Sequence, residues 1–236
     1  MRLSIVKNVG LLVLAVVGIA SRSHAATIIT VPLGLNPGDT YRLVFVTSAS
    51  TDATSGDIDY YNAFVTTAAD DVPELAALAA TWFDIGTTEA VSAINNIGID
   101  SGVPIYDLEG NLIANDAGTE AGGMFSGSIQ NPLIFNEVGA AFIGHGVWTG
   151  TAANGQSADG GELGSGSPVI GCTGSLGPSW IYCRSEIATQ GEFPLYAISG
   201  VLTPPVSTSP EPATTGMVIA AGALMFFAGR RNRRPL

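Results

Sequence analysis

Two apolar segments at the ends of the chain limit what can fold between them. The first follows Arg2 and Lys7, has an apolar core of about 12 residues over 9–20, and ends in small residues up to Ala25. A membrane-spanning helix needs about 20 apolar residues, so this core is too short for an anchor. The order of charged, apolar and small regions predicts a secretory signal peptide over residues 1–25, cleaved after Ala25.

The second apolar segment, residues 213–229, contains 17 residues without a charge and is followed by a basic cluster: Arg230, Arg231, Arg233 and Arg234. As a helix it measures about 25 Å, against a hydrocarbon core of about 30 Å. Arginine side chains can extend to the headgroups, and a basic cluster places the C-terminus on the cytoplasmic side. We therefore expect a C-terminal transmembrane helix within residues 213–236.

A proline-rich linker separates this tail from the rest of the chain. Residues 203–212 contain four prolines among serine and threonine, a composition that is extended and does not pack. The stretch before it, residues 26–202, is long enough for one domain to bury roughly 70% of its unfolded surface. We therefore place a single extracellular domain at 26–202.

The domain is strongly acidic. Its basic residues are Arg42 and Arg184, whereas all 20 acidic residues of the chain lie between Asp39 and Glu211, so the exported part has a net charge of about −18. Such a surface repels phosphate backbones and anionic headgroups. We therefore expect neither nucleic acids nor membrane surfaces to be binding partners of the domain.

Periodicity predicts helices only near the start of the domain. Two β-branched and aromatic runs, 26–32 and 40–48, indicate strands. Apolar residues at helical spacing then predict a helix over 57–69, and Pro73 precedes a second short helix over 74–81. This second helix should deliver Trp82 and Phe83 to the core.

The rest of the domain is rich in glycine and indicates strands and loops. Residues 103–116 predict a hairpin with its turn at 109–111, and residues 180–183 and 194–202 indicate the closing strands. Long glycine-rich loops connect these elements and are interrupted by the segment GVWTGT at 146–151. The expected class is α+β, with mixed strands.

Cys172 and Cys183 are the only cysteines. In an exported chain two cysteines favour a disulfide. Here it would close a short loop and stabilise the folded domain by about 2–3 kcal/mol in the chain-entropy model. Two thiols without nearby histidines lack a zinc ligand set, so no metal site is predicted from them.

Few residues offer catalytic chemistry. His145 is the only histidine after the signal peptide, and the chain lacks both a Gly-x-Ser-x-Gly motif and, within the domain, any lysine. We expect His145 to be a loop residue bonded to backbone. No catalytic residue is assigned, and we expect a non-enzymatic protein.

Carboxylate pairs leave an alternative open, because a glycosidase needs two carboxylates flanking a sugar. Pairs close in sequence include Asp57 and Asp59, Asp70 and Asp71, and Asp107 and Glu109. In so acidic a chain such pairs arise by chance, and Asp57 and Asp59 suit a helix start. No cofactor is predicted, although a calcium ion bound by oxygens stays open despite the lack of an EF-hand loop.

Trp148 and Trp180 lie in glycine-rich surroundings, and tryptophan often stacks on sugar rings. The simpler interpretation is that both belong to the core. Trp148 is nevertheless the candidate ligand contact.

The tail resembles a known sorting signal. Its parts are similar to the PEP-CTERM signal of Gram-negative bacteria: Pro210, Glu211 and Pro212 come first, then the short apolar span, and then the arginine cluster. The resemblance implies transient anchoring in the inner membrane and processing near these three residues by exosortase, a membrane-embedded enzyme. It also implies a role at the cell surface or in the exopolysaccharide matrix of biofilms. An ordinary single-pass anchor is the alternative.

The domain resembles, in scattered pieces from Tyr41 to Leu202, bacterial extracellular domains of the endostatin and C-type-lectin-like group. The pieces are YRLVFVTSASTDATSGDIDYYNAFV, IYDLEGNLIA, VWTGTAANG and the closing YC. The resemblance implies an α+β fold with two helices near the start and a long loop region near the end. The Glu-Pro-Asn and Trp-Asn-Asp calcium motifs of sugar-binding lectins are missing, so no calcium-dependent sugar site is implied.

Together these features predict an exported, non-enzymatic surface or matrix protein, with extracellular polysaccharide as a candidate partner of a lectin-like binding module. The alternative is a secreted polysaccharide hydrolase that uses a carboxylate pair.

Overall fold

The computed structural model describes residues 27–188 and 191–205. The predicted signal peptide, the predicted transmembrane helix and the sorting residues lie outside these ranges. Among the described residues, no helix combines the length and the apolar character that a membrane span requires.

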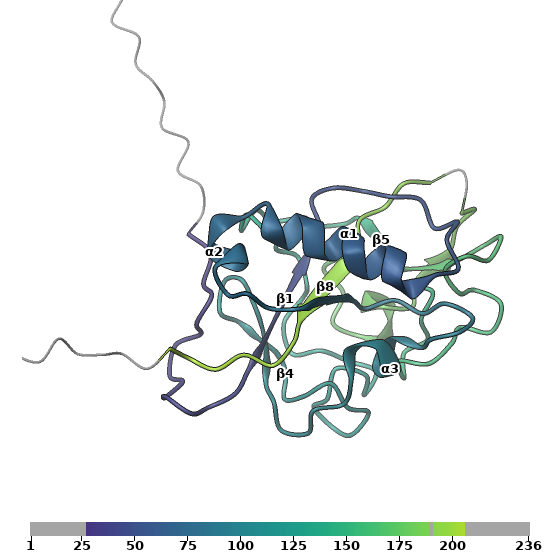
Figure 1. Ribbon diagram of the computed structural model, residues 1–236. Helices are drawn as coiled ribbons and strands as arrows, with labels where there is room; N and C mark the ends of the chain where they lie inside the picture. Colours follow the sequence, from purple (N-terminus) through teal and green to yellow (C-terminus); the bar gives the residue numbers. More distant parts are fainter. Residues whose placement is uncertain (1–26, 189–190, 206–236) are drawn as a thin grey trace, which may run out of the picture.

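A five-stranded mixed sheet forms the centre of the domain, in the order β2-β8-β1-β3-β4 (Figure 1). The strands are β1 Arg42–Val46, β2 Trp82–Asp84, β3 Ile105–Asp107, β4 Leu112–Ala114 and β8 Tyr196–Ser199. β1 pairs in parallel with β3 and antiparallel with β8, so the first and last strands lie side by side. This central position explains why every residue of β1 is buried.

Side-chain alternation along β1 divides the core into two parts. Leu43 and Phe45 belong to the cluster that includes buried residues of helix α1, Ile58–Asp70. Val44 and Val46 belong to the cluster that includes helix α3, Ala93–Ile97. Successive strand residues face opposite sides of a sheet, so these two helices cover its opposite faces (Figure 1).

The prediction of the first helix is confirmed. The carboxylate of Asp57 caps α1 by accepting a hydrogen bond of 3.1 Å from the backbone N–H of Asp59. The second helix, α2 Pro73–Ala76, begins at proline as expected but is much shorter than the apolar run that predicted it. The short helix α3 was not predicted.

Trp82 and Phe83 lie in strand β2 and not at the end of a helix, which corrects the expected connection. Trp82 is 1% exposed and packs edge-on against Phe45, with ring centroids 5.1 Å apart. Phe83 points to the opposite face and is only partly buried. The core role is thus confirmed for Trp82 and holds only in part for Phe83.

Other strand predictions met mixed outcomes. The hairpin is confirmed as β3 and β4, and the strand predictions around 40–48 and 194–202 are confirmed as β1 and β8. Residues 27–32 form no strand, and much of 180–183 follows a short 3-10 helix, Pro178–Trp180, so these two predictions are wrong.

A second, three-stranded antiparallel sheet lies in the glycine-rich half. Its strands are β5 Gly146–Trp148, β6 Val169–Cys172 and β7 Arg184–Ser185. The predicted disulfide is present between Cys172, which ends β6, and Cys183, which precedes β7, with Cα atoms 5.8 Å apart. The described chain is therefore a mixed α+β domain in which short strands outnumber helices.

Candidate functional site

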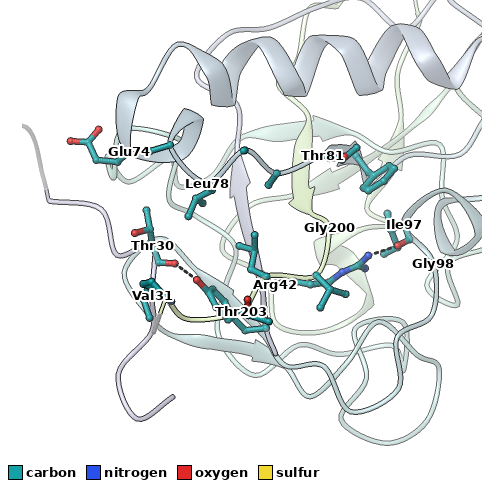
Figure 2. A pocket seen from close by; sticks show the side chains of 18 of the residues that line it. Thr30, Val31, Arg42, Glu74, Leu78, Thr81, Ile97, Gly98, Gly200 and Thr203 are labelled. Carbon is teal, nitrogen blue, oxygen red and sulfur yellow. Dashed lines mark hydrogen bonds between the residues drawn. The ribbon is translucent and has the colours of Figure 1, made fainter. Parts of the chain in front are cut away.

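A large cavity of the described domain lies at one end of the main sheet, where β1 begins and β8 ends (Figure 2). Its volume is about 930 Å³, within the range of roughly 300–1,000 Å³ typical of small-molecule sites. The walls come from the turn after α2, the start of β2, the end of α3 and the two chain segments around Val31 and Thr203.

Arg42, the first residue of β1, lines this pocket although it is only 3% exposed. Its Nη2 donates a hydrogen bond of 2.6 Å to the carbonyl oxygen of Ile97 and lies 3.1 Å from Oδ2 of Asp100. Nε and Nη1 are buried and have no hydrogen-bond partner among the residues that the structure describes. This arginine is therefore incompletely paired, and a buried donor without a partner costs about 1–3 kcal/mol of stability.

Burial dominates the electrostatics of Arg42. It lowers the pKa of the guanidinium, and the negative charge of Asp100 offsets part of that effect. Arginine nevertheless stays protonated in proteins, so a positive charge is held under the pocket wall. The other arginine of the described chain, Arg184, is an exposed partner of Glu186 at 2.5 Å and does not line this pocket.

Polar side chains surround the pocket. Thr81, Asn95 and Thr203 are exposed at its walls, and their side chains make no hydrogen bond to other described residues. The ring of Phe83 contributes an apolar surface. These groups can donate to and accept from a polar ligand without breaking existing hydrogen bonds.

The rim next to them is held in place by Tyr41. Its hydroxyl donates a hydrogen bond of 2.7 Å to the carbonyl oxygen of Thr30, drawn as a dashed line in Figure 2. The backbone of Tyr41 also forms an antiparallel bridge with Leu202, so both ends of the domain are joined beside the pocket.

The pocket lining has few charged side chains. Its lining contains one cation, Arg42, and one carboxylate, Glu74, and it has no cysteine or histidine. This site was not predicted from the sequence, because Arg42 begins the apolar run RLVFV of a strand. The one feature of the sequence that could have indicated the site is an arginine within a predicted strand, in a domain that has no lysine.

Trp148 is a core residue and not the candidate ligand contact. It is 0% exposed, its Nε1 donates a hydrogen bond of 2.9 Å to the carbonyl oxygen of Thr51, and Phe193 packs edge-on against it. Trp180 is equally buried and stacks with Phe125. Neither ring presents a face on which a sugar could stack.

His145 lies on the surface, directly before β5. Its backbone N–H donates a hydrogen bond of 2.9 Å to Oγ1 of Thr173, and its ring stacks on Phe142 with centroids 4.0 Å apart. His145 is thus a loop residue fixed by backbone hydrogen bonds, as expected.

The carboxylate pairs adjacent in sequence do not line the Arg42 pocket. Asp57 caps α1, and Oδ1 of Asp107 accepts hydrogen bonds from the backbone N–H groups of Glu109 and Asn111, which closes the hairpin turn. These two carboxylates therefore have structural roles that account for their positions.

Two other carboxylates, which no sequence pattern singled out, share a smaller cavity. Glu89 and Glu162 line a hollow of about 610 Å³ together with Leu163 and Ser165. Ser157 donates its hydroxyl hydrogen to Glu162, and this bond lowers the pKa of the carboxyl group. Glu162 is therefore ionised at neutral pH.

Comparison with protein-family models and with curated proteins found no match to this chain. Within the described part of the chain, no cluster of three or more histidine, cysteine or acidic residues is arranged to hold a metal ion.

Proposed function

We propose that this protein is an exported, non-enzymatic binding module of the cell surface or the extracellular matrix. The pocket around Arg42 carries this proposal, because it combines a sizeable volume, an incompletely paired cation and exposed polar side chains without a catalytic constellation. The disulfide between Cys172 and Cys183 supports export, since such bonds persist in oxidising compartments.

The placement of the domain ends supports attachment through the tail. The chain enters near residue 27 and leaves near residue 205 on the same side of the domain (Figure 1). The remaining body of the domain, including the second sheet, extends away from these ends. A protein tethered through residues after 205 would thus present most of its surface outward.

The arrangement of strands supports a C-type-lectin-like architecture. In the proposed architecture, two helices lie near the start of the domain and long loops fill its second half. The position of α1 and α2 directly after β1 agrees with this arrangement.

We further propose that the tail is a PEP-CTERM signal processed by an exosortase-type enzyme. The test is localisation of the tagged protein with and without residues 210–236 in the native host. The full-length chain should be found in the membrane and then at the surface or in the matrix, whereas the truncated chain should appear in the medium or periplasm without passing through the membrane fraction. Identical fractionation of the two proteins would contradict the sorting role.

A secreted polysaccharide hydrolase is the alternative, favoured by the shared cavity of Glu89 and Glu162. An ionised Glu162 could serve as the base or nucleophile that glycoside hydrolysis requires. Release of reducing sugar from the host's exopolysaccharide by the exported protein, abolished by Glu162→Gln or Glu89→Gln, would establish this activity in place of the binding role.

A further inference from the structure

Arg42 has a charge that its surroundings do not neutralise completely. Asp100, its ion-pair partner, contacts Nη2 and has a side chain that is 40% exposed to solvent. Nε and Nη1 have no acceptor among the described residues, although Arg42 is almost fully buried. A buried cation in this state favours an anion that can reach it through the pocket.

The surrounding charge restricts which anion can bind. The exported part of the chain has two basic residues against 20 acidic ones, and Glu74 lies on the pocket wall. Repulsion from these charges grows with the charge of the ligand, so a single carboxylate is accepted more readily than a doubly charged phosphate.

The walls indicate what carries this carboxylate. Exposed hydroxyl and amide groups of Thr81, Asn95 and Thr203 match the hydroxyl groups of a sugar, and the ring of Phe83 matches its apolar face. The volume of about 930 Å³ is large enough for more than a bare carboxylate.

We propose that this pocket binds the carboxylate of an acidic saccharide, and that Arg42 exchanges its ion pair with Asp100 for one with the ligand. This inference rests on the proposed binding function and names the ligand class of the module. Apart from its ion pair with Arg42, the Asp100 carboxylate has no hydrogen-bond partner among the described residues, and its side chain is 40% exposed, so it can turn to solvent when a ligand takes its place. Asp100 lies between Gly98 and Gly102, which both have φ of 74°.

The test is an NMR titration of the ¹⁵N-labelled exported protein with D-glucuronate, D-glucose and acetate. The reporter is the Nε–H signal of Arg42, identified by its loss in Arg42→Lys, while Arg184→Lys identifies the signal of the other arginine of the domain. We expect a saturable shift of the Arg42 signal with glucuronate, none with glucose, and a much weaker affinity for acetate.

A second variant keeps the test decisive if Arg42→Lys does not fold. Asp100→Asn removes the competing carboxylate and should lower the Kd for glucuronate several-fold. Glu192→Gln changes the net charge equally at an exposed residue outside the pocket, and should leave the Kd unchanged after correction for ionic strength.

Three results would overturn the proposal: no response of folded protein to glucuronate, an equal response to glucose, or a Kd that Asp100→Asn does not change. Acetate binding as tightly as glucuronate would show a simple carboxylate site and overturn the saccharide assignment. These results are independent of the localisation experiment, so loss of the ligand assignment and loss of the sorting role can be told apart.

Discussion

At the scale of single residues, Asp84 is the group whose environment opposes its charge. Its carboxyl group is 0% exposed, and neither oxygen has a hydrogen-bond partner among the described residues. Burial raises the pKa of Asp84 well above its ordinary value. The folded protein therefore holds a proton that the unfolded chain releases at lower pH.

We predict that Asp84→Asn stabilises the protein at neutral pH. In the wild type, Asp84 does not change the free energy of unfolding below the pKa of the unfolded chain, about 3.9. Above this pH, the free energy of unfolding falls by about 1.4 kcal/mol per pH unit, until the pH reaches the raised pKa of Asp84 in the folded state. Asparagine has a similar shape and no charge, so this loss disappears. Urea unfolding of both proteins at pH 4 and pH 7 measures the difference.

The matched control for Asp84 is Glu120→Gln, which removes a charge from an exposed side chain. It should change stability little and by the same amount at both pH values. An Asp84→Asn variant that is less stable than the wild type by equal amounts at pH 4 and pH 7 would show that Asp84 does not titrate as described.

Trp82 and Phe83 are adjacent, but the structure predicts different costs for their removal. Trp82→Ala should destabilise the domain by roughly 3–5 kcal/mol, because the indole is buried against Phe45. Phe83→Ala should cost clearly less, since that ring is only partly buried. Equal losses in chemical denaturation would show that the two faces of β2 are packed alike.

At the scale of elements, the disulfide fastens the loop between β6 and β7. Trp180 enters the core from this loop, and its carbonyl oxygen accepts a hydrogen bond of 3.0 Å from the hydroxyl of Tyr196 in β8. The bridge therefore stabilises the contact between the second sheet and the main sheet.

We predict that changing Cys172 and Cys183 together to serine costs about 2–3 kcal/mol and leaves the main sheet folded. Hydrogen exchange should become faster over residues 173–182, while α1 and β1 keep their relative protection. The wild type in reducing agent should behave like the double variant. Loss of protection throughout the domain would mean that the bridge maintains the whole fold.

At the scale of the whole molecule, both ends of the domain lie beside the Arg42 pocket, where the backbone of Tyr41 pairs with Leu202. The linker, which starts at residue 203, therefore begins at the pocket rim, where Thr203 and Pro205 line the pocket. Any attachment through the tail keeps the pocket close to the point of attachment, while the second sheet lies farther away (Figure 1).

We predict that changing Pro210, Glu211 and Pro212 to alanine blocks processing but keeps the anchor, because the apolar span and its arginines are unchanged. Blotting of fractionated cells should show a membrane-bound protein heavier than the mature form. Changing the four tail arginines to glutamine should instead weaken anchoring. A triple-alanine protein that is still trimmed and released would reduce Pro210–Pro212 to a linker.

Local patterns in the sequence were sufficient for features that depend on neighbouring residues. The helix start near Asp57, the helix after it, the hairpin around Gly110 and the strand β1 were predicted, because helix-start preferences, periodicity and turn chemistry act over a few residues. The disulfide was predicted from compartment and cysteine count. Helix α2 was predicted too long, since a local apolar run does not show where tertiary packing ends a helix.

Only the tertiary structure decided which residues meet. For Trp148 and Trp180 the core was the simpler interpretation, but their glycine-rich context left a ligand contact open at Trp148, and burial by distant segments places both in the core. The Arg42 pocket is assembled from segments around residues 30, 80, 97 and 203, which no local pattern brings together. Contacts between residues so far apart depend on the order of strands in the sheet. That order is set by the packing of both faces and not by the preferences of any single stretch.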